Sequence, residues 1–67
     1  MNIKLTSEYI TLTQLLKICD YVSSGAEAKF MVKELNILVN GEKENRRGKK
    51  LYPNDVIIIN GKKITLS

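Results

Sequence analysis

Histidine is absent from this 67-residue chain, and cysteine occurs only once. Without histidine, the side chain that most often acts as a general acid or base near neutral pH is missing. A lone thiol, Cys19, cannot close an internal disulfide, which favours a reducing compartment. A zinc site built from cysteine and histidine needs about four ligands, so the composition excludes one. We therefore expect no catalytic residues, no metal, no cofactor and no enzyme.

Long apolar runs are also missing. The longest is Val56–Ile59, far below the roughly 20 residues that span a bilayer. The opening residues MNIKLTSEY lack the apolar core of a signal peptide. No stretch has the GxxxxGK[ST] spacing of a phosphate-binding loop. We expect a soluble, cytoplasmic protein without membrane contact. Its length predicts a single domain over residues 1–67, and so small a domain should work through its surface.

Positive charge is concentrated in the C-terminal part. Residues 1–39 contain four lysines and four acidic residues, whereas residues 40–67 contain seven basic and three acidic residues. The formal net charge of +4 therefore belongs entirely to the second part. Its densest stretch is NRRGKK, residues 45–50, which we call the basic segment. The asymmetry favours an anionic partner, nucleic acid before a membrane surface; the alternative is a charged turn that only keeps a small domain soluble.

A first helix is predicted over residues 12–21. Thr11 and Gln14 form a capping box, in which the threonine oxygen accepts from a backbone N–H and the glutamine reaches back. Apolar residues follow at helical spacing. Cys19 lies on their stripe, which predicts a buried, structural thiol rather than a reactive one. Before this helix, alternation of apolar and polar residues over 3–9 predicts a short N-terminal strand.

A second helix is predicted over residues 25–35, opened by a capping box from Ser24 and Glu27. One side carries the apolar stripe that should face the core. The opposite side carries an aromatic ring between two lysines, namely Lys29, Phe30 and Lys33. Such a face can stack a nucleic-acid base, or the ring can pack beneath the N-terminal strand or the chain end, and the sequence leaves both open.

The remaining residues predict strands and turns. Asn40-Gly41 and Asn60-Gly61 each follow an apolar run, and Asn-Gly indicates a type I′ hairpin turn because both central residues need positive φ. In Tyr52-Pro53-Asn54-Asp55, the proline presets φ and the asparagine tolerates the left-handed region. The predicted fold class is α+β, with two N-terminal helices packed on a small, mostly antiparallel, twisted sheet and a short N-terminal strand.

The stretch SSGAEAKFMVKELNILVNGEKENRRGKKLYPNDVIII resembles the S4-like RNA-binding domain, also called the αL motif, named after the fourth small-subunit ribosomal protein. The family pattern runs Ala-Lys, an apolar pair, VLVNG, a basic loop and L-x-P-G-D-x-I. Its counterparts here are Ala28-Lys29, Met31-Val32, Ile37–Gly41 and Leu51–Ile57. The match covers about residues 11–59 and looks most like the small, stand-alone YaaA-type members.

The resemblance implies an RNA-binding protein, with structured ribosomal RNA as the family's most frequent ligand and ribosomal or ribosome-assembly proteins as further partners. It carries over to the exposed face of the second helix and to the basic segment: Lys29, Phe30, Lys33, Arg46, Arg47, Lys49 and Lys50. We add Gly48, which would let the backbone turn sharply and approach the ligand, or would be a turn glycine without a ligand role. The alternative function is a protein-interaction module that docks on an acidic partner.

Three positions depart from the family pattern. Many members have an arginine early in the second helix, where this chain has Gly25. Asn54 replaces the glycine of the PGD turn, a mild change because asparagine also adopts the left-handed region. Phe30 replaces a residue that is commonly basic. The missing arginine shifts more of the expected RNA binding onto the basic segment.

Overall fold

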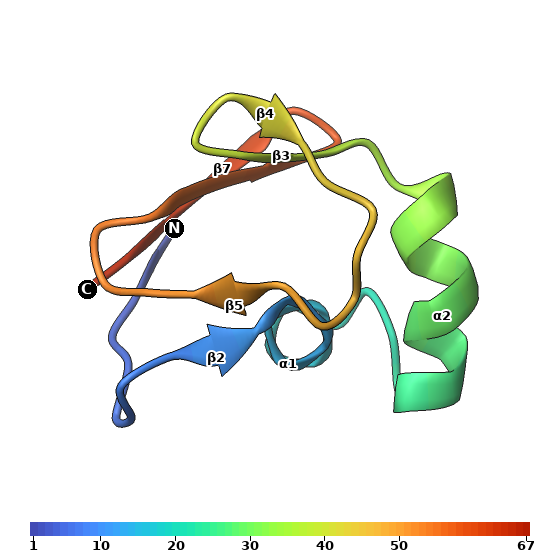
Figure 1. Ribbon diagram of the computed structural model, residues 1–67, viewed down its shortest axis with the longest axis horizontal. Coiled ribbons are helices and arrows are strands. Elements are labelled where there is room, and N and C mark those ends of the chain that lie inside the picture. The colour runs from blue at the N-terminus through green and yellow to red at the C-terminus, as the bar shows by residue number, and fades with distance from the viewer.

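Two helices and seven short strands make up the computed structural model, which describes residues 1–67 (Figure 1). In chain order they are β1 (Asn2–Ile3), β2 (Ile10–Thr11), α1 (Leu12–Ile18), α2 (Gly25–Glu34), β3 (Ile37–Val39), β4 (Glu42–Lys43), β5 (Lys50–Leu51), β6 (Val56–Ile59) and β7 (Lys62–Leu66). A five-stranded sheet has the order β1-β7-β6-β3-β4, and β2 and β5 form a separate two-stranded sheet. The predicted α+β class is confirmed, as is the short N-terminal strand.

Helix α1 begins as predicted but ends earlier. The capping box is present: Thr11 Oγ1 accepts from the N–H of Gln14 at 3.3 Å, and Gln14 Oε1 accepts from the N–H of Thr11 at 2.7 Å. The helix ends at Ile18 instead of residue 21, because Asp20 adopts a left-handed φ of 62°. The N–H of Tyr21 then donates to the oxygen of Leu16 at 2.9 Å, the bond expected when a left-handed residue closes a helix.

Cys19 is the C-cap residue of α1 and is half-buried against the core. Burial raises the pKa of its thiol, and the neighbouring Asp20 adds to the rise. A raised pKa leaves little of the nucleophilic thiolate near neutral pH. The predicted structural role is consistent with this environment, although the side chain is less buried than expected.

Helix α2 matches its predicted range except for Leu35, which is its C-cap. Ser24 Oγ accepts from the N–H of Glu27 at 3.2 Å. The Glu27 carboxylate, however, accepts from the N–H of Ser23 at 3.0 Å, one residue before the cap, so the second capping box is only half formed. Ala28 and Val32 are buried on the predicted stripe.

The sheet confirms both Asn-Gly hairpins. Asn40 and Gly41 have φ of 51° and 86° between β3 and β4, and Asn60 and Gly61 have φ of 49° and 82° between β6 and β7. These are the two positive values that a type I′ turn requires. All pairs in the larger sheet are antiparallel except β1 with β7. The β2–β5 pair was not predicted.

The buried residues form one cluster beneath the five-stranded sheet. Side chains alternate across a strand, so β3, β6 and β7 bury every second residue on one face. Figure 1 shows α1 and the β2–β5 pair below the sheet and α2 at its side. Leucines of α1 and Leu51 of β5 fill the space between, with no exposed surface. Neither α1 nor α2 has the length and the apolar character that a membrane-spanning helix requires.

Candidate functional site

The basic segment joins β4 to β5 and runs between α1 and α2 (Figure 1). Its main chain is fixed to α1: the N–H of Leu12 donates to the oxygen of Lys49 at 2.9 Å, and the N–H of Thr13 to the oxygen of Arg47 at 3.0 Å. Thr13 Oγ1 donates to the same Arg47 oxygen at 2.9 Å. The first N–H groups of a helix lack partners within it, so the segment caps α1 and is held in place by it.

Gly48 lies in a tight turn within the segment. The N–H of Lys49 donates to the oxygen of Arg46 at 3.1 Å, which leaves Arg47 and Gly48 in the middle of the turn. Gly41 and Gly61 have positive φ, but Gly48 does not. A Cβ atom there would meet nothing within 4 Å. The backbone conformation at Gly48 therefore does not itself require a glycine, and a close approach of the ligand to this position stays a prediction.

Arg47 links the basic segment to α2. Its Nη1 donates to the main-chain oxygen of Gly25, the first residue of α2, at 3.0 Å. Gly25 occupies the place where the sequence resemblance expects an arginine. A guanidinium therefore does stand at the start of α2, but it is supplied by the basic segment. Sequence reasoning missed this contact because the two residues are distant in the chain.

Arg46 already has a carboxylate partner. Its Nε donates to Glu44 Oε2 at 2.9 Å and its Nη2 to Glu44 Oε1 at 3.1 Å, which is a two-pronged ion pair. The Glu44 side chain is 10% exposed and that of Arg46 is 71% exposed. Hydrogen bonds from Arg46 lower the pKa of Glu44 to about 2, and Glu44 in turn raises the pKa of Arg46. Both groups are therefore charged near neutral pH, and the charge of Arg46 is compensated.

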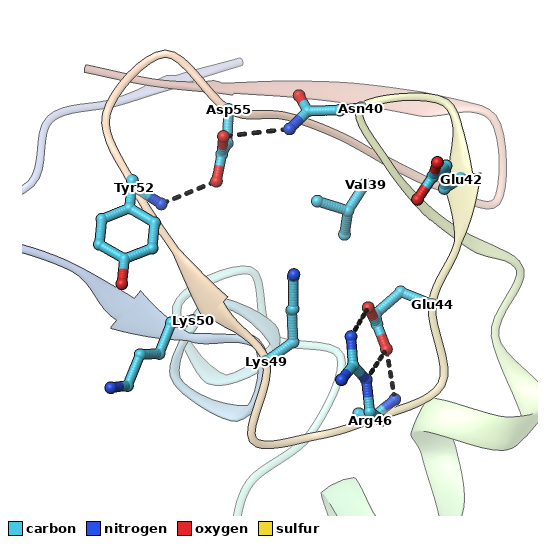
Figure 2. Close-up of a pocket in the computed structure, with 9 residues that line it drawn as sticks. All are labelled: Val39, Asn40, Glu42, Glu44, Arg46, Lys49, Lys50, Tyr52 and Asp55. Carbon is cyan, nitrogen blue, oxygen red and sulfur yellow. Dashed lines mark hydrogen bonds and ion pairs between the residues drawn. The ribbon is translucent and has the colours of Figure 1, made fainter.

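A groove lies between the β3–β4 hairpin and β5, and its lining is mostly polar. Figure 2 shows Arg46 turned toward Glu44 on one side, Tyr52 and Asp55 on the other, and Lys49 between them. Lys50 lines the groove as well, but its ammonium group points away from the other lining side chains, toward β2. The structure therefore brings the four cations of the basic segment to one region but gives each a different environment.

Asp55 fixes the far side of the groove. Its Oδ2 accepts from the N–H of Tyr52 at 2.8 Å, and its Oδ1 accepts from Asn40 Nδ2 at 3.1 Å. Asn40 Oδ1 accepts in turn from the N–H of Val56 at 2.9 Å. These bonds join the first hairpin to the Tyr52–Asp55 turn, where Asn54 has the predicted left-handed φ, 78°. The Asp55 carboxylate is thus engaged in holding the fold.

Helix α2 exposes its predicted charged face. Lys29, Phe30 and Lys33 all lie on the surface, and Phe30 is 69% exposed. The alternative that Phe30 packs beneath the N-terminal strand or the chain end is therefore wrong. Gly25, Lys29 and Lys33 are spaced four residues apart and follow one another along one side of the helix. The Gly25 end of this side is the place that Arg47 contacts. The two parts of the predicted site, the basic segment and the exposed face of α2, therefore meet at Gly25.

Two tyrosines at the same end of β2 and β5 form a cluster that sequence reasoning missed. The ring centroids of Tyr9 and Tyr52 are 5.8 Å apart, with 47° between the ring planes. Lys50 Nζ lies 5.0 Å from the centroid of the Tyr9 ring. Finding the cluster from the sequence required the β2–β5 pairing, and strands of two residues carry too little alternation to reveal it.

Comparison with known proteins adds two findings. A family model described as S4 domain matches residues 3–67. The chain is also 49% identical over 59 residues to a protein of Bacillus subtilis (strain 168) named "Probable ribosome maturation protein RlbA". That match covers 88% of this chain and 83% of the Bacillus protein. The family match spans the basic segment, α2 and the groove between β3–β4 and β5.

Proposed function

The chain belongs to the S4 domain family, and from that premise we propose that it binds structured ribosomal RNA during ribosome maturation. It acts in the cytoplasm as a single-domain binding protein without a catalytic step. The contact surface is the basic segment together with the exposed face of α2. Family membership and the name of the Bacillus relative support the RNA- and ribosome-related role, and the arrangement of cations supports the surface.

The hydrogen bond from Arg47 to Gly25 is the observation that carries this assignment. It joins the densest positive charge of the chain to the start of the helix side that bears Lys29 and Lys33. Phosphates spaced along one RNA backbone would thus meet a continuous row of cations.

The cations have different roles in this mechanism. A guanidinium has five N–H donors, and Arg47 uses one of its nitrogens on Gly25, so the others can grip a phosphate. Lys49 and Lys50 act as point charges. The guanidinium of Arg46 donates two hydrogen bonds to the Glu44 carboxylate, so a phosphate must compete with that carboxylate for it. Arg47 and the two lysines therefore contribute most of the affinity.

The direct test removes all four charges in Arg46→Ala/Arg47→Ala/Lys49→Ala/Lys50→Ala. The probe is ribosomal RNA purified from Bacillus subtilis ribosomes, with affinity measured by filter binding over a range of salt. If about four to six phosphates are neutralised, the slope of log K against log salt is roughly −3 to −5 for the unmodified chain. We expect the variant to bind weakly and to show a flatter slope.

A charge-matched control is available elsewhere on the surface. Four exposed lysines lie outside the proposed site, and their combined replacement by alanine changes the net charge equally: Lys4, Lys17, Lys62 and Lys63. This control should keep most of the affinity. Equal losses of affinity in the two variants would show that binding depends only on net charge. Unchanged affinity in the variant of the basic segment would show that this segment is not part of the site. Thermal unfolding of both variants checks that they fold.

A protein partner is separated from an RNA partner by a second experiment. The tagged protein is captured from lysate together with whatever it binds, and half of the sample is treated with ribonuclease. Proteins bound through RNA are released by this treatment. Partners that remain would instead indicate direct docking on an acidic protein surface.

A further inference from the structure

We propose that Tyr9, Tyr52 and Lys50 form a tyrosine platform that takes one unpaired nucleotide of the RNA. Its base stacks on the exposed rings and its phosphate lies against the lysine. This inference rests on the proposed RNA binding and adds to it a site of a different kind. The cations of the basic segment and of α2 grip the backbone of structured RNA, whereas the tyrosine platform takes an unpaired base.

The register of β2 and β5 creates the platform. These strands pair antiparallel with Ile10 opposite Leu51 and Thr11 opposite Lys50. Both Ile10 and Leu51 are buried. The next position along the ladder places Tyr9 opposite Tyr52. Because side chains alternate across a strand, these tyrosines share the outer face with Lys50, whose diagonal position brings it over the Tyr9 ring.

The rings are open to solvent although they touch each other. Tyr9 is 37% exposed and Tyr52 is 43% exposed. Each ring thus uses part of its surface on the other and leaves part uncovered. A base has a π-face that stacks on such rings irrespective of its identity. The ammonium group of Lys50, 5.0 Å from the Tyr9 centroid, supplies the positive charge that the nucleotide's phosphate requires.

The platform is in position before any ligand arrives. The N–H of Tyr52 donates to Asp55 Oδ2 at 2.8 Å, and the N–H of Asp55 donates to the main-chain oxygen of Tyr52 at 3.1 Å. The main-chain oxygen of Tyr9 accepts from Ser7 Oγ at 2.8 Å. These bonds fix the main chain beneath both rings, and the contact between the rings, whose centroids are 5.8 Å apart, restricts their side chains. Side chains that are restricted beforehand lose less freedom on binding.

The platform is continuous with the basic segment. Tyr52 lines the same groove as Arg46 and Lys49 (Figure 2), and a second hollow joins it to Gly48 and Lys50. An RNA backbone that follows the segment therefore reaches the rings. Bases inside a duplex are already stacked on their neighbours and cannot splay out, so only an unpaired nucleotide can use the site.

The test compares two variants on two RNAs. Tyr9→Leu/Tyr52→Leu keeps apolar side chains but removes the rings, and Tyr9→Phe/Tyr52→Phe keeps the rings. The probes are a perfectly paired RNA duplex and the same duplex with a three-nucleotide bulge. On the bulged RNA we expect the leucine variant to bind about five- to 150-fold more weakly and the phenylalanine variant to bind like the unmodified chain. On the perfect duplex all three should bind alike.

Tyrosine emission gives a second measurement that needs no change in the platform. The chain has three tyrosines and no tryptophan. In Tyr21→Phe, which alters a half-buried residue packed against the core, only Tyr9 and Tyr52 emit. Saturating bulged RNA should quench this emission more strongly than saturating duplex. This measurement decides the matter even if the leucine variant does not fold.

The outcomes separate the two proposals. If the four-alanine variant loses both RNAs while the leucine variant binds the bulged RNA normally and emission is unchanged, the platform is wrong and the proposed function stands. Equal losses of the leucine variant on both RNAs would also overturn the platform, because the tyrosines would then act only on the fold. If the unmodified chain binds neither RNA but still binds ribosomal RNA in the filter assay, the platform is wrong and the proposed function stands. If it does not bind ribosomal RNA either, both proposals are wrong.

Discussion

The guanidinium of Arg47 donates a hydrogen bond to the main-chain oxygen of Gly25 at a distance of 3.0 Å. One residue belongs to the loop before β5 and the other is the first residue of α2. Many S4-like domains carry an arginine near that helix start, so this chain places the same chemical group there from a different part of the sequence.

This hydrogen bond predicts that an arginine at position 25 can replace Arg47 in RNA binding. Arg47→Ala should weaken binding to ribosomal RNA by about tenfold or more, because a guanidinium that can bind phosphate is lost. Adding Gly25→Arg in the same protein should restore much of the affinity. A Cβ at Gly25 meets nothing within 4 Å, so the new side chain has room. Filter binding measures both steps.

Gly25→Ala in the Arg47→Ala background is the control for this exchange. It adds a Cβ to the helix without adding a cation, so any gain from helix propensity alone appears there. The interpretation would be wrong if the alanine rescued binding as well as the arginine did.

Glu44 is predicted to hold back part of the affinity. Glu44→Gln removes the carboxylate that compensates Arg46, so the free guanidinium should tighten RNA binding a few-fold at low salt. One more neutralised phosphate would steepen the slope of log K against log salt by about 0.9. Glu42→Gln is the matched control, because Glu42 lines the same groove without an ion pair to Arg46. An equal gain in the control would show that only net charge matters.

The same ion pair predicts a pH dependence of stability. The pKa of Glu44 is about 2 in the folded protein, against an ordinary value of 4.5. A carboxyl whose pKa is lowered by folding contributes stability above its unfolded pKa and loses that contribution as the pH falls through the folded value. The free energy of unfolding should therefore fall between about pH 4.5 and 2. Urea unfolding of Glu44→Gln, compared with the unmodified chain, should show a shallower fall in this range, whereas parallel curves would contradict the assignment.

Phe30 is predicted to matter for binding and not for stability. Its side chain is 69% exposed, so Phe30→Ala should change the free energy of unfolding by no more than about 0.5 kcal/mol. If the ring stacks an unpaired base, the variant should lose about 1–3 kcal/mol of RNA binding. Met31→Ala provides the contrast, because Met31 packs against the core and its loss should lower the thermal midpoint. Unchanged RNA affinity in Phe30→Ala would remove the ring from the interface.

Features with local chemical causes could be predicted from the sequence. The Thr11–Gln14 capping box and the two Asn-Gly turns depend on residues within a few positions of one another, and all three are present. The early end of α1 was missed because Asp20 takes a left-handed φ while the apolar pattern continues beyond it. An apolar stripe indicates which side of a helix is buried but does not show where the helix stops.

The contacts that organise the candidate site could not be predicted in this way. The bond from Arg47 to Gly25 and the facing of Tyr9 and Tyr52 join residues that are distant in the chain. The contact between the tyrosines depends on the β2–β5 pairing, and the Arg47 bond depends on the path of the basic segment. Both features arise only when the core has formed. The positions of the basic residues were visible in the sequence, but the compensation of Arg46 by Glu44 was not.

The anchoring of the basic segment to α1 has a consequence for the thermodynamics of association. Fixing the backbone of one residue costs about 1–2 kcal/mol in conformational entropy. The oxygens of Arg47 and Lys49 are already bound to the first N–H groups of α1, so this entropy is lost when the chain folds and not when RNA arrives. In the proposed complex, RNA would meet a backbone that needs no rearrangement, and the rate of encounter would be governed by diffusion and by the long-range attraction of charges.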